Sequence, residues 1–84
     1  MSREEIVDTT NKFLSEEFEI NIADIAPANN LKETLGLDSL DYVDLVVVIE
    51  DNFGFKITIE DFKDIVTFED FYSWVERKKS AQAA

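Results

Sequence analysis

The sequence predicts one all-α domain, residues 1–84, with three longer helices, one short third helix and a long loop between helices one and two. Four N-cap residues, each followed three positions later by an acid, mark four helix starts, because cap oxygen and acid satisfy free amide hydrogens there. With 84 residues, 45% of them hydrophobic, the chain can build one small core. The cap and acid pairs are Ser2 and Glu5, Asp38 and Asp41, Thr58 and Asp61, and Thr67 and Asp70.

The first helix is expected from about Arg3 to Phe18, because apolar side chains recur there at helical spacing. Residues 19–34 contain Pro27 and two asparagines and indicate a long loop, with a short helical turn near Leu31. The helical stripe consists of Ile6, Thr10, Phe13, Leu14 and Phe18. The side chains expected to fix the loop to the core are Ile20, Ile22, Ile25 and Leu31.

The second helix, about Ser39 to Phe53, carries conflicting signals. The stretch 45–49 is mostly β-branched and by itself would suggest a buried strand. However, Asp38 can cap a helix start, Gly54 can end a helix, and apolar residues 45, 49 and 53 repeat every four positions. We therefore predict a helix.

Two further helices complete the prediction. A short helix follows Thr58, over residues 59–65, and a longer one follows Thr67, over residues 68–79. Basic residues at 77–79 suit the negative end of the last helix, and residues 80–84 are expected to fray. The buried face of the last helix is predicted to consist of Phe68, Phe71, Tyr72 and Val75.

Composition excludes several classes of function. The chain has no cysteine and no histidine, which excludes disulfides, thiolate metal sites and His-dependent catalytic triads. A net charge of −11 disfavours nucleic acid and favours basic protein surfaces as partners. The longest apolar run has five residues and the N-terminal residues are charged, so we expect no membrane span, no signal peptide and a cytoplasmic location.

The acidity is concentrated on the predicted second helix. Residues 38–51 contain five acids and no base, and three aliphatic residues lie on a stripe partly offset from the core stripe. A solvated helix face is the ordinary meaning of such a run. We call this surface the outer face, and its members are Leu40, Asp41, Val43, Asp44, Val47, Glu50 and Asp51.

The segment from Leu35 to Leu45, LGLDSLDYVDL, resembles the modification site of acyl carrier proteins. The similarity continues through residues 49–57 and 65–68 and, with the first-helix stripe, covers residues 3–77. Three features depart from the family pattern, one of them being the phenylalanine-rich last helix with Trp74. Thr58 stands where proline is frequent, and Val48 stands where many fatty-acid carriers have alanine, which predicts a narrower or differently shaped acyl pocket.

The resemblance implies an acyl-carrier-like four-helix bundle that is not an enzyme. A phosphopantetheinyl transferase attaches 4′-phosphopantetheine to the Ser39 hydroxyl, and the arm holds acyl groups as thioesters. Free amide hydrogens and the helix dipole would favour the phosphate at this helix start. Asp38 caps the helix and contributes to recognition, and the outer face docks onto basic patches of the transferase, synthases and acyltransferases. No metal site is expected, and the resemblance implies a monomer.

The pathway stays open at this point. Fatty-acid biosynthesis or related acyl or polyketide biosynthesis fits the acidity and the Asp-Ser-Leu segment. An aminoacyl carrier of the peptidyl or D-alanyl kind has the same fold and arm. An unmodified acidic helical adaptor that binds a basic partner is the alternative from another class, with Ser39 then an ordinary first-turn residue.

Overall fold

Three longer helices and three short helical segments make up the computed structural model, which describes residues 2–83, with side chains for residues 2–80. Within this part of the chain there is no strand, only an isolated bridge between Asn30 and Thr67, so the predicted all-α class is confirmed. The elements are α1 (Arg3–Phe18), the 3-10 helix η1 (Ile22–Asp24), α2 (Leu31–Leu35), α3 (Ser39–Phe53), the 3-10 helix η2 (Ile59–Asp64) and α4 (Phe68–Ala83).

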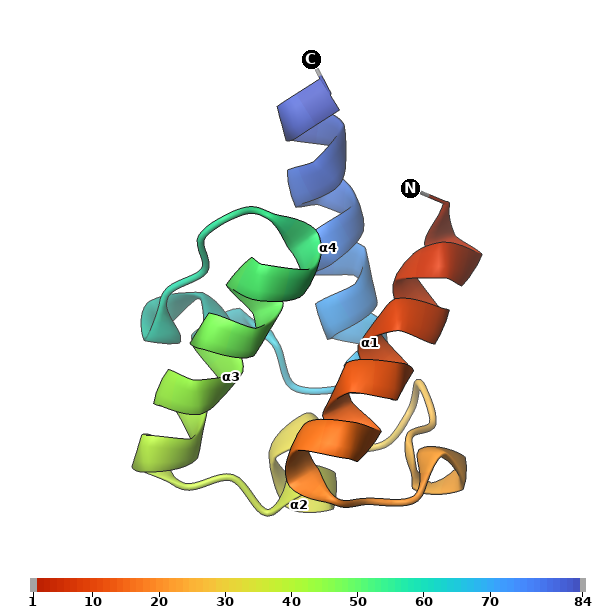
Figure 1. Cartoon of the computed structure of the whole chain (residues 1–84), viewed down its shortest axis with the longest axis vertical. Helices are drawn as coiled ribbons and strands as arrows, with labels where there is room; N and C mark the ends of the chain where they lie inside the picture. Colours follow the sequence, from red (N-terminus) through yellow and green to blue (C-terminus); the bar gives the residue numbers. More distant parts are fainter. Residues whose placement is uncertain (1, 84) are drawn as a thin grey trace.

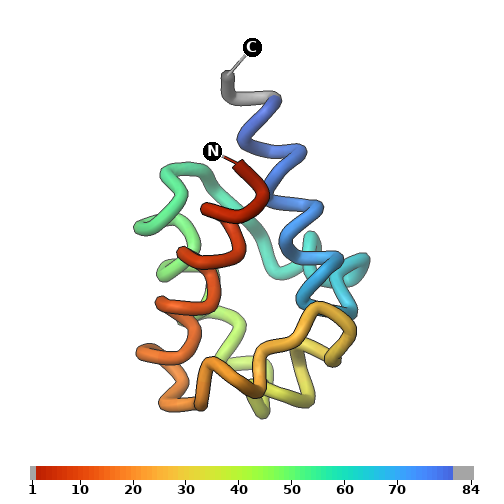
Figure 2. Tube along the Cα trace, turned by 90° about the vertical axis from the view of Figure 1, so that its right-hand side faces the viewer, coloured from red at the N-terminus to blue at the C-terminus, as the bar shows by residue number. Residues whose placement is uncertain are grey.

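The three longer helices surround the core (Figure 1). α1 packs against α4, and the start of α1 and the end of α4 lie at the same end of the molecule (Figures 1 and 2). η1 and α2 lie at the opposite end, where α1 stops and α3 begins. This arrangement places the first turn of α3 away from both chain termini.

Helices α1 and α3 have the predicted bounds, and reciprocal caps explain where they start. The Ser2 hydroxyl oxygen accepts the Glu5 amide at 3.2 Å, and Glu5 Oε1 accepts the Ser2 amide at 3.4 Å. At α3, Asp38 Oδ1 accepts the amide of Asp41 at 3.0 Å, and Asp41 Oδ2 accepts the amide of Asp38 at 3.1 Å. Each pair satisfies amides that have no partner within the helix.

Helix α3 keeps its β-branched run in helical form because burial follows a helical period. Leu45, Ile49 and Phe53 are at most 2% exposed, whereas the intervening valines are half-buried or exposed. Gly54 ends the helix with a φ of 76°, a left-handed conformation that costs glycine little. The helical interpretation is therefore confirmed over the strand alternative.

The loop between α1 and α3 holds more structure than predicted, since it contains η1 as well as α2. Asn30 caps α2 by accepting the Glu33 amide at 2.9 Å. Ile25 and Leu31 are buried as expected, but Ile22 is 50% exposed. The expectation for Ile22 was wrong because η1 has no buried residue of its own, and Ile25, which directly follows it, supplies the contact with the core.

The last two predicted helices differ in detail from expectation. The segment after Thr58 is a 3-10 helix that ends at Asp64 rather than an α-helix that ends at residue 65. α4 starts as predicted, with the Thr67 hydroxyl oxygen accepting the Asp70 amide at 3.2 Å. Its described backbone continues to Ala83, beyond the predicted end at residue 79. The predicted fraying of residues 80–84 falls partly on Ala84, which lies outside the described residues.

The core contains two series of aromatic contacts. One joins α1, α3 and α4 through neighbouring ring pairs 5.5–5.9 Å apart. The other runs inward from the surface of α3 to α4, with spacings of 5.2–6.5 Å. All four predicted members of the α4 face are buried. The first series is Phe13, Phe53, Phe55 and Trp74, and the second is Tyr42, Phe62, Phe71 and Tyr72.

Candidate functional site

Ser39 is the first residue of α3 and is exposed. Its hydroxyl forms no hydrogen bond with any other described residue. The chain that leads to it is held on both sides of Gly36, because Leu35 and Leu37 are 8% and 5% exposed and belong to the core. Gly36 itself has a φ of 65°, which allows the sharp turn between α2 and α3. The serine therefore projects from a fixed helix start.

The amide hydrogens of this helix start are mostly occupied. Asp38 Oδ1 accepts the amides of Leu40 at 2.9 Å and Asp41 at 3.0 Å, and the Asp38 carbonyl accepts the Tyr42 amide at 3.3 Å. The expectation of free amide hydrogens at this helix start is therefore only partly met. Among the described residues, the Ser39 amide is left without a partner, and the helix dipole still favours negative charge here.

The outer face of α3 is separated from its buried stripe. Leu40, Val43 and Val47 are 77%, 50% and 53% exposed. Asp41 is half-buried, and the other three acids of this face are exposed. Within residues 2–80 the outer-face acids form no ion pair with a basic side chain. The structure thus brings together, on one side of one helix, the residues that the sequence analysis grouped.

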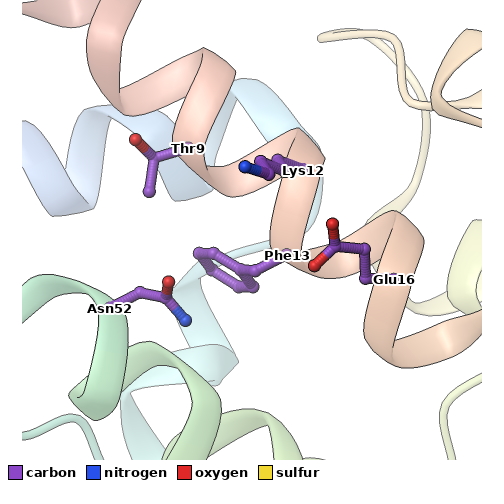
Figure 3. A pocket seen from close by; sticks show the side chains of 5 residues that line it. All are labelled: Thr9, Lys12, Phe13, Glu16 and Asn52. Atoms are coloured by element: carbon purple, nitrogen blue, oxygen red, sulfur yellow. The ribbon is translucent and has the colours of Figure 1, made fainter.

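One surface hollow lies away from Ser39. It has a volume of about 350 Å³ and lies between α1 and the last turn of α3. Figure 3 shows Phe13 pointing from α1 toward Asn52 of α3. Asn52 is 13 residues from Ser39, roughly 20 Å along the helix axis. Thr9, Lys12 and Glu16 also line it, and no site residue predicted from the sequence does.

The smaller hollow adjoins the start of α3. It has a volume of about 220 Å³ and lies between α2, α3 and η2. Tyr42, one helical turn beyond Ser39, forms part of its wall. The centres of the Tyr42 and Phe62 rings are 5.2 Å apart. Burial raises the pKa of Tyr42. Tyr42 is not among the site residues predicted from the sequence, although an aromatic residue three positions after the serine was a visible signal.

Two negative observations complete the site. Among residues 2–83, no group of acids is arranged to hold a metal ion. None of the described helices has the length and apolarity needed to cross a bilayer.

Val48 is half-buried and packs against the core. It lines neither of the two hollows described above, so the predicted effect of Val48 on an acyl pocket stays a prediction.

Fold and site together show a small helical domain with an exposed serine at the start of α3. The family model for the phosphopantetheine attachment site matches residues 12–75. The acyl carrier protein of Thermotoga maritima is 38% identical over 77 residues, which cover 92% of this chain and 95% of that protein. The chain belongs to the acyl carrier protein family.

Membership has direct consequences for chemistry. Proteins of this family are carriers on which partner enzymes act, not enzymes themselves, and their prosthetic group is covalent 4′-phosphopantetheine. The residues present fit such a group, because an exposed hydroxyl without a hydrogen-bond partner stands at a rigid helix start. A phosphopantetheinyl transferase and acyl-handling enzymes are the partners that membership implies.

Proposed function

We propose that Ser39 is the attachment point of the arm and that the protein carries acyl intermediates for fatty-acid or related acyl or polyketide biosynthesis. The observation that carries the proposal is the exposed Ser39 hydroxyl, within the matched region and at the first position of α3. When bound, the arm supplies a terminal thiol that holds an acyl group as a thioester. Because the Ser39 hydroxyl donates no hydrogen bond to a side chain among the described residues, we assign the base that activates the serine to the transferase.

Asp38 has a positioning role in this proposal. Its carboxylate accepts hydrogen bonds from the amides of Leu40 and Asp41 in the first turn of α3. The preceding residue, Leu37, is buried in the core and fixes the chain that leads into this turn. The Ser39 hydroxyl therefore points outward without support from its own hydrogen bonds. The exposed Asp38 side chain also offers a negative charge beside the hydroxyl, to which we assign a part in transferase recognition.

The outer face of α3 is proposed to contact the transferase, synthases and acyltransferases. Acids without ion-pair partners steer a basic partner toward the helix, and this attraction weakens with salt. The exposed side chains of Leu40, Val43 and Val47 supply apolar contact area, whose burial favours association. The outer face therefore carries both the acidic side chains and the exposed aliphatic side chains, and it begins next to Ser39.

Intact-protein mass tests the attachment point. After incubation with coenzyme A and a broad-specificity transferase, the wild type is expected to gain one phosphopantetheine unit. Ser39→Ala is expected to gain none, and Ser80→Ala, which removes another exposed helical serine, is expected to gain one unit. A gain that persists in Ser39→Ala would contradict the assignment. Absence of a gain with several transferases would favour the unmodified adaptor.

A further inference from the structure

Asp41 differs from the other acids of the outer face in what its carboxylate contacts. Its Oδ2 accepts the backbone amide of Asp38 at 3.1 Å, and the residue is half-buried. The other three acids of this face are exposed, and their side chains form no hydrogen bond within residues 2–80. Asp41 is therefore tied to the backbone that leads to Ser39, whereas the other acids project into solvent.

The backbone that leads into α3 is held by one amide after another. The Leu37 amide donates to the Lys32 carbonyl at 3.0 Å, which joins the chain to α2. The next amide, that of Asp38, donates to Asp41 Oδ2 and has no other acceptor among the described residues. The Ser39 amide, which follows, has no acceptor in this part of the chain. The Asp41 carboxylate is thus the last restraint on the backbone before Ser39.

This restraint acts on the residue that caps the helix. The backbone of Asp38 is extended, with φ −112° and ψ −173°, in a broad region of conformational space that does not by itself select one direction. A hydrogen bond to the Asp38 amide limits rotation of the peptide unit that carries it. The same rotation would move the Asp38 carboxylate away from the amides of Leu40 and Asp41, which it accepts. The bond from Asp41 therefore keeps the cap and Ser39 in one arrangement.

The start of α3 has less backbone support than the start of α4. At α4, the Phe68 amide donates to the Asn29 carbonyl at 3.2 Å, and the Glu69 amide donates to the Pro27 carbonyl at 3.0 Å. Among the described residues, no comparable backbone bond joins the first turn of α3 to another segment. The reciprocal bonds between Asp38 and Asp41 therefore carry a larger share of the order at the helix start that presents Ser39.

We infer that Asp41 is a positioning residue for the modification of Ser39. Its carboxylate oxygen holds the Asp38 amide and so fixes the direction in which the Ser39 hydroxyl projects. This role requires a hydrogen-bond acceptor and not a negative charge. The inference rests on the proposed function and deepens it, because it divides the acids of the outer face into one that positions the serine and three that attract the transferase.

Steady-state kinetics of loading test this role. Mass gain is followed over a range of carrier concentrations with coenzyme A and the transferase, which gives kcat and KM for each variant. Asp41→Asn keeps an acceptor oxygen and is expected to retain the wild-type kcat. Asp41→Ala lacks the acceptor and is expected to lower kcat about tenfold, because the hydroxyl is no longer held in the reactive direction. The same kcat in Asp41→Ala and wild type, or an equal loss in Asp41→Asn, would overturn the inference.

Asp44 provides the matched control, since it is an exposed acid one helical turn further along the same face. Asp44→Asn and Asp44→Ala are expected to raise KM to the same extent, and this increase should shrink as salt screens the attraction. The kcat loss of Asp41→Ala should persist at high salt. A loss that disappears with salt would show that Asp41 acts through its charge, contrary to the inference. Circular dichroism confirms that each variant is folded at the assay temperature.

Amide proton shifts examine the contact without any transferase. In Asp41→Ala the Asp38 amide proton is expected to move upfield because it loses its acceptor, whereas Asp41→Asn should keep most of its downfield position. An unchanged Asp38 shift in Asp41→Ala would reject the inference. Loading of the wild type combined with an unimpaired kcat in Asp41→Ala would reject the inference alone and leave the carrier function intact. Failure of the wild type to gain the arm with several transferases would reject the proposed function, and the inference with it.

Discussion

Asp38 organises the helix start from which Ser39 projects. Its carboxylate accepts two backbone amides of α3, and its own amide is bound by the carboxylate of Asp41. Thr67 and Asp70 form a comparable reciprocal cap before α4, where the Thr67 hydroxyl oxygen accepts the Asp70 amide and Asp70 Oδ2 accepts the amides of Val66 and Thr67. At the residue scale, single carboxylates thus decide where the helices begin.

Substitution of Asp38 separates capping from recognition. Asp38→Ala is expected to lower the free energy of unfolding by ~1 kcal/mol, since two amides lose their acceptor. Asp38→Asn retains a cap oxygen and is expected to cost less stability, while slowing modification by the transferase because the charge is gone. Urea denaturation and the rate of mass gain measure the two effects. Equal stability of Asp38→Ala and wild type would contradict the capping role.

Asp70 predicts a pH dependence of stability. Backbone hydrogen bonds from Thr67 and Val66 lower the pKa of Asp70 below the ordinary value of 3.8. Because the folded state holds this carboxylate ionised, its contribution is present above pH 3.8 and is lost as pH falls through the lower folded pKa. The stability difference between wild type and Asp70→Asn is therefore expected to shrink as pH falls below about 3.8. Thermal unfolding over this range measures it, and a difference independent of pH would argue against the assignment.

At the scale of elements, α4 supports the end of α3. Lys79 Nζ donates a hydrogen bond to the carbonyl of Phe53, the last residue of α3, and lies 5.7 Å from the centre of the Phe55 ring. The last carbonyls of a helix have no partner within it, and a cation there also opposes the negative end of the dipole. The extension of α4 beyond its buried face thus has a structural role, since it stabilises a neighbouring helix.

Removal of this contact has a measurable cost. Lys79→Met is expected to lower the free energy of unfolding by ~1 kcal/mol, because the Phe53 carbonyl loses a charged donor. Arg77→Met is the matched control, since Arg77 is an exposed cation of the same helix, and its effect is expected to stay within about 0.5 kcal/mol. The midpoint of urea denaturation measures both. Similar losses in the two variants would show that net charge, and not the contact, is responsible.

At the scale of the whole molecule, one small core holds a strongly acidic surface together. The net charge is −11, and one ion pair, between Arg3 and Glu76 at 3.9 Å, occurs among residues 2–80. Repulsion among the remaining acids opposes the compact state. The aromatic contacts of the core provide the opposing packing energy.

Salt is therefore expected to stabilise the protein. The melting temperature should rise between low ionic strength and about 0.15 M salt, because the screening length falls to ~8 Å, and each kcal/mol gained corresponds to ~4–8 °C for a domain of this size. Magnesium should raise it more than sodium at equal ionic strength. The combined variant Asp44→Asn and Glu50→Gln should respond less to salt. A melting temperature that does not change with salt would contradict this account.

Local chemistry explains why so much of the fold was predictable. Several features depend only on residues close together in the chain. They are the bounds of α1 and α3, the caps at Ser2, Asp38 and Thr67, and the left-handed conformation of Gly54 at the end of α3. Such interactions can be identified from spacing and residue type. The separation of the outer face from the buried stripe of α3 follows in the same way, because a helix converts spacing in sequence into direction.

Contacts between distant segments could not be predicted in this way. The exposure of Ile22, the 3-10 geometry of η2 and the bond from Lys79 to Phe53 depend on how elements pack. The occupied amides around Ser39 depend on the orientation of the Asp38 side chain. The smaller hollow beside Tyr42 exists because α2, α3 and η2 meet there. The sequence by itself determined the three longer helices, because local hydrogen bonds and periodicity specify them, and the motif around Ser39 indicated the family. Only the tertiary structure decided what surrounds that serine, because packing sets the distances between residues far apart in the chain.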